Sequence, residues 1–248
     1  MGEWIDRGFA YKTSKVGEGK GPGLVVLMEA YGVNDHFRNL TERFSRWGLT
    51  AIAPDLYNRL PSDRRIVPYS DRETAMSNLS RVKDGEVRED IVRAISLLNK
   101  DKNVDPERIG VVGYCMGGRL AFLSAEWFGS GLKAVACFYG GGIGAPKGYF
   151  PGQTEVPLAG VDKISAPLLL LYGEEDTFIP EGERSAVSDA LRSAGKKFQM
   201  VTYSGAGHGF FCEDRPSYHP ESAHASEKVL REFLLHSLKD QGNVDVHK

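Results

Sequence analysis

Short, almost continuously apolar segments alternate along this chain with segments whose apolar residues recur at helical spacing. Strands that are apolar without a break are buried on both faces, which is typical of a parallel β-sheet between two layers of helices. The alternation therefore predicts an α/β fold around a mostly parallel sheet. The predicted strands cover residues 24–29, 50–54, 109–114, 134–139, 168–172 and 197–203, and the predicted helices cover residues 35–47, 84–99, 116–128, 180–193 and 220–238.

A length of 248 residues is compatible with one or two domains. A sheet with helices on both faces commonly forms a single domain of this size. We predict a single domain over residues 1–248, with residues 1–22 and the polar tail 241–248 at its periphery. Residues 57–69 and 140–161 fit neither strand nor helix. Both follow strand ends, where open α/β sheets bind ligands, so each is either a wall of a pocket or a plain surface connection. Whether the first of them closes as a lid is left open.

The charge balance gives no reason to expect a nucleic-acid or membrane partner. The formal net charge is −2, the isoelectric point is about 6.3, and no basic cluster stands out. No apolar run is long enough to span a bilayer, and the first residues lack the basic and apolar regions of a signal peptide. Three cysteines, an odd number, suit a reducing compartment, so we expect a cytoplasmic protein. The oligomeric state, monomer or small homo-oligomer, is left open.

The most informative motif is Gly113-Tyr114-Cys115-Met116-Gly117, which directly follows a predicted strand. Small residues two positions before and after a nucleophile are required where a strand turns sharply into a helix, because the backbone there passes too close for side chains. Cys115 would then stand at a helix N-terminus, which favours a thiolate. The alternative is a glycine-rich turn around a buried thiol.

A catalytic cysteine needs a base and a group that orients the base, and in α/β-hydrolases the acid and then the histidine follow the nucleophile along the chain. Asp176 lies in a turn after a predicted strand, with Glu174 and Glu175 as competing carboxylates and a solvated acidic turn as the alternative. His208 lies in a glycine-lined loop between the last strand and the last helix, a location that suits a base. The other histidines fit less well, because they lie at helix starts, within helices or in the tail: His36, His219, His224, His236 and His247.

Neither a metal nor a cofactor is predicted. No cysteine or histidine pair has zinc spacing, and His-Glu-x-x-His is absent. The glycine-rich string at 140–145 matches a dinucleotide fingerprint only in letters, because Pro146 and Gly148 follow where a helix should open. Cys137 lies in an apolar strand and is expected in the core, whereas Cys212 is expected either to pack or to line the pocket.

Together these motifs resemble the dienelactone hydrolase family of the α/β-hydrolases, from about residue 23 to residue 238. Gly-Tyr-Cys-Met-Gly-Gly at 113–118 is similar to the cysteine elbow of that family, Tyr-Gly-Glu-Glu-Asp at 172–176 to its acid loop, and Gly-Ala-Gly-His-Gly-Phe at 205–210 to its histidine loop. The resemblance implies an α/β-hydrolase fold and a hydrolase of esters or lactones. It also implies a catalytic triad of Cys115, His208 and Asp176.

Residues 28–34, Met-Glu-Ala-Tyr-Gly-Val-Asn, resemble the family segment whose glutamate interacts with the thiol. Glu29 takes that place, and a carboxylate that ends a buried apolar strand is costly unless it is paired or functional. The alternative is a glutamate that reaches solvent. The resemblance further implies an oxyanion hole formed by the backbone amides of Ala30 and Met116, and a resting state in which Glu29 competes with His208 for the thiol proton.

Members of the family that act on dienelactone hold its carboxylate with two arginines. Arg72 stands at the first position, but Cys212 stands at the second, so a single guanidinium is expected to bind an anionic or polar substrate. Arg215, three residues farther on, either compensates or is a surface charge. Tyr139 either contacts the substrate or is packed at its strand end. The departure at Cys212 leaves the physiological substrate open.

The sequence thus predicts a hydrolase that cleaves a small ester or lactone through a thioester. The alternative enzymatic function is that of a broad-specificity carboxylesterase of the same fold. From a different class, the alternative is a non-catalytic binding protein or a thiol sensor in which Cys115 reports oxidation. Asp176 and His208 favour turnover, because a sensor needs no general base.

Overall fold

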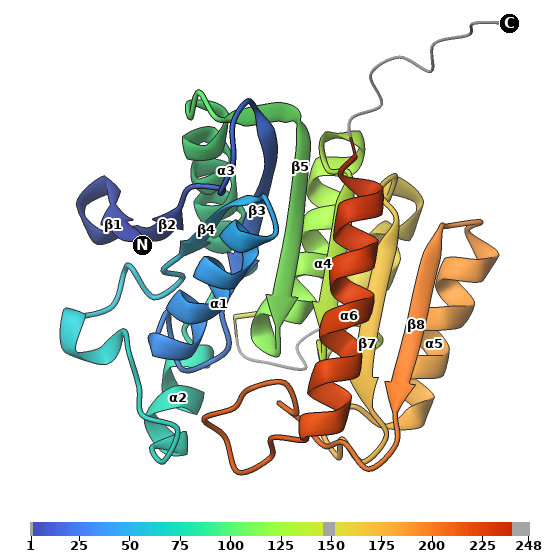
Figure 1. The fold of residues 1–248 in the computed structure, drawn as a ribbon. Coiled ribbons are helices and arrows are strands. Elements are labelled where there is room, and N and C mark those ends of the chain that lie inside the picture. The colour runs from blue at the N-terminus through green and yellow to red at the C-terminus, as the bar shows by residue number, and fades with distance from the viewer. Residues whose placement is uncertain (1, 146–151, 240–248) are drawn as a thin grey trace, which may run out of the picture.

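The computed structural model describes residues 2–145 and 152–239, through which one eight-stranded β-sheet runs (Figure 1). The strands are β1 (Glu3–Ile5), β2 (Ala10–Thr13), β3 (Gly21–Leu27), β4 (Thr50–Pro54), β5 (Val104–Tyr114), β6 (Ala134–Phe138), β7 (Leu168–Gly173) and β8 (Phe198–Tyr203). Their order across the sheet is β1-β2-β4-β3-β5-β6-β7-β8. Pairing is antiparallel where β2 meets β1 and β4, and parallel from β4 through β3 to β8. The predicted mostly parallel sheet is confirmed.

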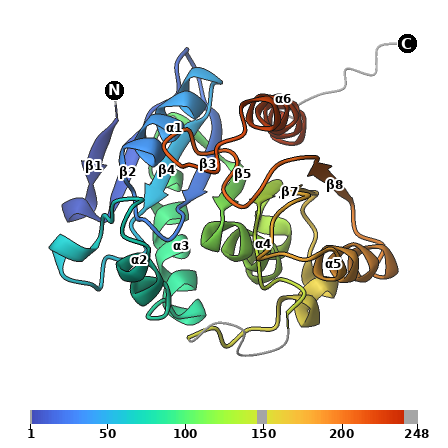
Figure 2. The same ribbon diagram turned by 90° about the horizontal axis from the view of Figure 1, so that it is seen from below.

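Helices cover both faces of the sheet (Figure 2). The helices α1 (Asp35–Arg46) and α6 (Pro220–Ser237) lie on one face, and α3 (Asp84–Asn99), α4 (Met116–Phe128) and α5 (Glu181–Ser193) lie on the other. The short α2 (Arg72–Leu79) lies near the edge to which the parallel strands point (Figure 1). Short 3₁₀ helices occur at Asp6–Gly8, Ser62–Arg64, Gly129–Gly131 and Pro157–Lys163. Within the described ranges, no helix combines the length and the apolar character needed to cross a bilayer.

Helix α1 shows how local sequence sets the bounds of an element. The side chain of Asn34 accepts a hydrogen bond from the amide of Phe37 at 3.3 Å, which caps the helix N-terminus. Phe37, Leu40 and Phe44 recur at helical spacing and are buried against the sheet. Gly48, at a φ of +87°, follows the helix and turns the chain toward β4.

All six predicted strands and all five predicted helices are present, with shifted ends. Strand β3 ends at Leu27, so Met28 and Glu29 lie beyond the strand rather than inside it. Strands β1 and β2 and helix α2 were not predicted from the sequence. The first two are short strands at the antiparallel edge of the sheet, and α2 buries only Ala75 and Asn78, so it has no clear apolar stripe. The tail 241–248 and part of the predicted loop 140–161 lie outside the described residues.

The carboxyl ends of the parallel strands bring distant segments together. In the register of the sheet, Leu27 of β3 lies opposite Gly113 of β5, which lies opposite Cys137 of β6. The residues that directly follow these three strands therefore meet at one edge. In open α/β sheets this edge is where ligands bind.

Gly113 and Gly117 allow the turn between β5 and α4 to pack against β3. A Cβ on Gly113 would lie 1.9 Å from the carbonyl oxygen of Gly117, and a Cβ on Gly117 would lie 2.3 Å from the carbonyl oxygen of Leu27. Both distances are far below van der Waals contact, so a side chain there requires the backbone to move. The amide of Gly117 donates to the carbonyl oxygen of Met28 at 3.2 Å, which ties the turn to the end of β3.

We expect Gly117→Ala to lower the free energy of unfolding by about 2–4 kcal/mol, because the new methyl group must displace the backbone of β3. Gly85→Ala is the matched control. Nothing lies within 4 Å of a Cβ at Gly85 in α3, so that change should be neutral or stabilising by about 0.5 kcal/mol. Urea unfolding followed by circular dichroism measures both variants, and equal stabilities would contradict the packing described.

Candidate active site

Cys115 stands between β5 and α4 in a backbone conformation that few residues adopt. Its φ is 55° and its ψ is −117°, and such a positive φ costs a non-glycine residue of order 1–3 kcal/mol. The amide of Cys115 donates to the carbonyl oxygen of Phe138 at 3.0 Å, which fixes the turn against β6. The half-buried side chain stands at the N-terminus of α4, where the helix dipole favours an anion. This is the strand-turn-helix geometry predicted from the glycine spacing.

Three side chains from separate elements meet at this turn. His208, in the loop after β8, brings Nε2 to 3.1 Å from Sγ of Cys115. Its Nδ1 lies 2.7 Å from Oδ2 of Asp176, which follows β7 and is 3% exposed. The competing carboxylates Glu174 and Glu175 are exposed. The structure therefore brings together the three residues predicted as a triad and leaves the two competitors outside it.

The pKa of His208 is raised to about 10. Burial alone would lower this pKa, because it disfavours the charged ring, but the negative charge of Cys115 and the hydrogen bond to Asp176 outweigh burial. The rings of Tyr139 and Phe178 pack against the imidazole, with centroids 5.2 and 5.3 Å from its own. A histidine that is protonated at neutral pH stabilises a thiolate beside it, the nucleophilic form of cysteine.

Ala30 and Met116 border the same cavity as Cys115. Neither of their backbone amides donates a hydrogen bond within the part of the chain that the structure describes. Met116 is the first residue of α4, and the first amides of a helix have no partner inside it. Two free donors beside a nucleophile are what the oxyanion of a tetrahedral intermediate requires. The predicted pair of amides is thus available at the site.

Glu29 is completely buried beyond the end of β3. Its Oε1 accepts a hydrogen bond from the hydroxyl of Tyr139 at 3.0 Å, and its Oε2 pairs with Nη1 of Arg215 at 3.2 Å. The alternative that Glu29 reaches solvent is therefore wrong, and its charge is balanced inside the protein. No hydrogen bond joins Glu29 to Cys115 among the described residues, where the thiol is paired with His208. The competition for the thiol proton stays a prediction about another state of the site.

Arg215 is not a surface charge. Its side chain is 16% exposed, and its guanidinium lies between Glu29 and Tyr31, whose ring centroid is 5.6 Å from Cζ. Burial would lower the pKa of Arg215, but the negative charge of Glu29 outweighs burial and raises it. Gly209 makes room for the guanidinium, because a Cβ at its φ of +77° would lie 2.2 Å from Nη1 of Arg215. This glycine directly after His208 is the sequence signal that could have revealed the pair.

Tyr139 and Cys212 lie behind the cavity and do not border it. The hydroxyl of Tyr139 is engaged by Glu29 and its side chain is completely buried, so the expected substrate contact is not found in this structure. Tyr139 is instead packed at the end of its strand, which was the alternative expectation. Cys212 is also completely buried, and its Sγ donates to the hydroxyl of Tyr69 at 3.1 Å. Cys212 is therefore packed inside the protein, which was one of the two expectations for it.

The cavity beside Cys115 has a volume of about 150 Å³. Arg72, the first residue of α2, borders it with Cζ 5.6 Å from the ring centroid of Phe178. Arg72 is exposed and has no ion pair among the described residues. A guanidinium that is free beside an apolar cavity suits a substrate with a carboxylate. The apolar walls are formed by Tyr31, Met76, Leu79 and Phe178.

Arg119 also borders the cavity, but its charge is committed elsewhere. It is 2% exposed and donates to both oxygens of Asp84, at 2.7 and 3.2 Å. Asp84 accepts two further hydrogen bonds from the amides of Thr154 and Glu155, both at 3.0 Å. This carboxylate therefore holds the chain next to Gln153, which borders the cavity, against the start of α3.

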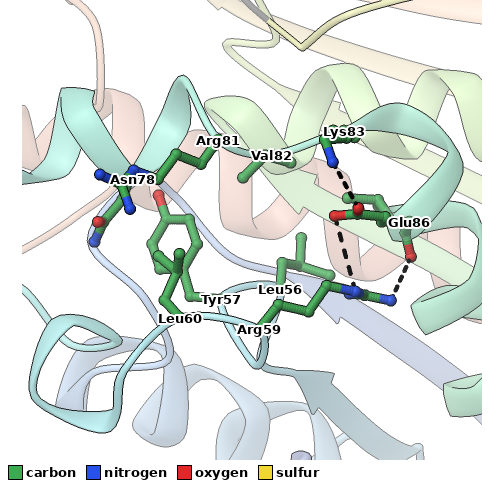
Figure 3. A pocket seen from close by; sticks show the side chains of 10 residues that line it. Leu56, Tyr57, Arg59, Leu60, Asn78, Arg81, Val82, Lys83 and Glu86 are labelled. Carbon is green, nitrogen blue, oxygen red and sulfur yellow. Dashed lines mark hydrogen bonds and ion pairs between the residues drawn. The ribbon is translucent and has the colours of Figure 1, made fainter.

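A second hollow lies between the segment after β4 and the start of α3 (Figure 3). Its volume is about 20 Å³, and Leu56 and Tyr57 form part of its wall. Arg59 and Lys83 both pair with Glu86 beside it. Because it is too small for a substrate, it is not a candidate active site.

One group of side chains in the described ranges could hold a metal ion, namely His36, Cys212 and Asp214. None of them borders the cavity beside Cys115. This group was not predicted from the sequence, because His36 is far from the other two residues along the chain and no spacing rule detects such a group.

Comparison with known proteins points to one family. Residues 7–238 match the model of the "Dienelactone hydrolase family". A Synechocystis protein named "Putative carboxymethylenebutenolidase" is 33% identical over 230 residues, which is 92% of each chain. A Bradyrhizobium protein named "Probable 2-oxo-3-(5-oxofuran-2-ylidene)propanoate lactonase" is 24% identical over 230 residues, which is 90% of each chain. The crystal structure of a "Putative Dienelactone Hydrolase" from Klebsiella pneumoniae has a TM-score of 0.82 at 31% identity and covers 91% of each chain.

We expect Asp176→Asn to lower the pKa of His208 from about 10, because the amide removes a negative charge and a hydrogen-bond acceptor that raise it. The imidazole should therefore lose its proton at a lower pH in the variant than in the wild type. A titration of the histidine ring signals by nuclear magnetic resonance measures this shift. Asp189→Asn, at an exposed position of α5, is the control and should leave the titration unchanged. An unchanged titration in Asp176→Asn would exclude Asp176 as the orienting acid.

Proposed function

Because the chain belongs to the dienelactone hydrolase family, whose fold is that of the α/β-hydrolases, we propose that it cleaves an ester or lactone through Cys115, His208 and Asp176. One observation carries the proposal. Nε2 of His208 lies 3.1 Å from Sγ of Cys115 while Nδ1 lies 2.7 Å from Asp176. A nucleophile, a base and an orienting acid in mutual contact support acyl transfer.

In the first half of the reaction, the sulfur of Cys115 attacks the carbonyl carbon of the substrate. The carbonyl oxygen becomes an oxyanion that accepts hydrogen bonds from the amides of Ala30 and Met116. The imidazolium of His208 then gives its proton to the leaving alkoxide as the carbon–oxygen bond breaks. A thioester and a neutral histidine remain. When the substrate is a lactone, the new alcohol stays tethered to the acyl group.

In the second half, neutral His208 takes a proton from a water molecule, which attacks the thioester carbon. The same two amides hold the second oxyanion. The carbon–sulfur bond breaks, the thiolate of Cys115 returns, and the carboxylic acid product leaves. Asp176 keeps the imidazole oriented throughout and stabilises its protonated form.

We propose a substrate that carries a carboxylate. Arg72 supplies an uncommitted guanidinium at the cavity, whereas Arg119 and Arg215 are paired with Asp84 and Glu29. The name of the Bradyrhizobium relative describes a lactone with a propanoate group, which is an anion at neutral pH. A cavity of about 150 Å³ suits a small ring of this kind.

Cys115→Ala should reduce kcat for a p-nitrophenyl ester by about 10⁴-fold, because it removes the nucleophile. Intact-mass spectrometry of the wild type mixed rapidly with the ester should show an acyl adduct, which Cys115→Ala lacks. Cys137→Ala, at a buried thiol in β6, is the control and should keep both adduct and activity. Full activity in Cys115→Ala would exclude the proposed nucleophile. If the wild type shows neither an acyl adduct nor turnover, the protein is instead a non-catalytic binding protein or thiol sensor.

Arg72→Ala should reduce kcat/KM for an anionic lactone such as a dienelactone by about 10- to 100-fold, because one charge-assisted hydrogen bond is worth roughly 1.5–3 kcal/mol. A neutral ester of similar size should be hydrolysed at an unchanged rate. Arg192→Ala, at an exposed position of α5, is the matched control and should change neither rate. If the wild type prefers the neutral ester and Arg72→Ala changes the hydrolysis of neither substrate, the protein is a broad-specificity carboxylesterase.

A further inference from the structure

His36, Cys212 and Asp214 place three possible metal ligands close together, outside the cavity beside Cys115. One ligand atom from each of the three lies within 4.8 Å of the other two. His36 is the second residue of α1, whereas Cys212 and Asp214 lie in the loop that follows His208. The group therefore joins the start of a helix on one face of the sheet to the loop that carries the histidine.

The imidazole of His36 is buried and lacks a partner. The residue is 8% exposed, and its Nε2 has no hydrogen-bond partner in the described part of the chain. Its ring packs edge-on against Phe37 and Phe211, with centroids 5.4 and 6.4 Å away. A buried polar nitrogen without a partner is costly, so the structure leaves a donor atom available to a ligand.

The three donor atoms are of the kinds that a zinc ion prefers. Imidazole nitrogen, thiolate sulfur and carboxylate oxygen together select a borderline-soft divalent cation, and three protein ligands leave the fourth tetrahedral position to water. Zinc holds such ligands at roughly 2.0–2.3 Å, which requires the three atoms to draw closer than they are here. Asp214 is exposed and free to make that adjustment.

The three ligands can offset the charge of a divalent cation. A thiolate at Cys212 and a carboxylate at Asp214 would together balance the two positive charges of a divalent ion. Tyr69 supplies a supporting contact, because its hydroxyl lies 3.1 Å from Sγ of Cys212 and can turn its proton toward a thiolate.

We propose that His36, Cys212 and Asp214 bind one zinc ion or a similar divalent cation. On binding, the thiol of Cys212 releases its proton to solvent and the sulfur coordinates the ion, with water completing the shell. The bound ion fastens the loop between His208 and α6 to the first turn of α1. The site has no part in the proposed hydrolysis, so either proposal stands if the other fails.

Cobalt(II) added to the Cys115→Ala variant tests the site, because that variant has no active-site thiol to compete. We expect one equivalent of cobalt to produce a thiolate-to-metal charge-transfer band together with the intense visible bands of tetrahedral cobalt. Zinc should abolish both bands by displacing the cobalt. Zinc should also raise the midpoint of thermal unfolding, because it binds the folded chain in preference to the unfolded one.

Single changes in the same background assign the ligands. Cys212→Ser should remove the charge-transfer band, and Asp214→Asn, a surface change that leaves the fold intact, should weaken cobalt binding by about 100-fold. His224→Gln, at an exposed histidine of α6, is the control and should bind as tightly as its parent. A charge-transfer band that survives Cys212→Ser, or the lack of any thiolate band while Cys212 is intact, would overturn the proposal.

Discussion

The hydrogen bond from the amide of Gly117 to the carbonyl oxygen of Met28 is the contact on which the rest of the site depends. It joins the first turn of α4 to the chain leaving β3 at 3.2 Å, an approach that no side chain at Gly117 would permit. Through it, Cys115 from one strand end and Ala30 from its neighbour border a single cavity. Backbone contacts thus place the nucleophile and the two amide donors, independently of the side chains that line the cavity.

Buried charge organises the other side of the site. Glu29 has no access to water, and its partners come from the end of β6 and from the loop that carries His208. Removing the cation from a buried ion pair costs several kcal/mol, so the position of that loop is tied to the charge of Glu29. Tyr139 reaches the carboxylate from a backbone with a φ of +35°, and its hydrogen bond helps to offset that strain.

The features that could be predicted from the sequence are those encoded by local patterns. The apolar runs of the parallel strands and the glycines around Cys115 each lie within a few residues, and they predicted the sheet and the turn. Order along the chain singled out Asp176 and His208, but only the structure gives their distances. The pairing of Glu29 with Arg215 joins positions 186 residues apart and depends on where β3 ends, which no local pattern encodes. Strands β1 and β2 were missed because such short edge strands carry too few residues for a periodic signal.

Asp84 has a consequence for how such a site diversifies. Its carboxylate holds Arg119 and the amides of Thr154 and Glu155, yet it does not border the cavity beside Cys115. The rim of the cavity near Gln153 is therefore positioned by a helix that does not border the cavity. A substitution that moves the start of α3 reshapes this rim and leaves the backbone around the nucleophile in place. In related proteins, substitutions near the start of α3 can therefore change the substrate preference while the catalytic residues stay the same.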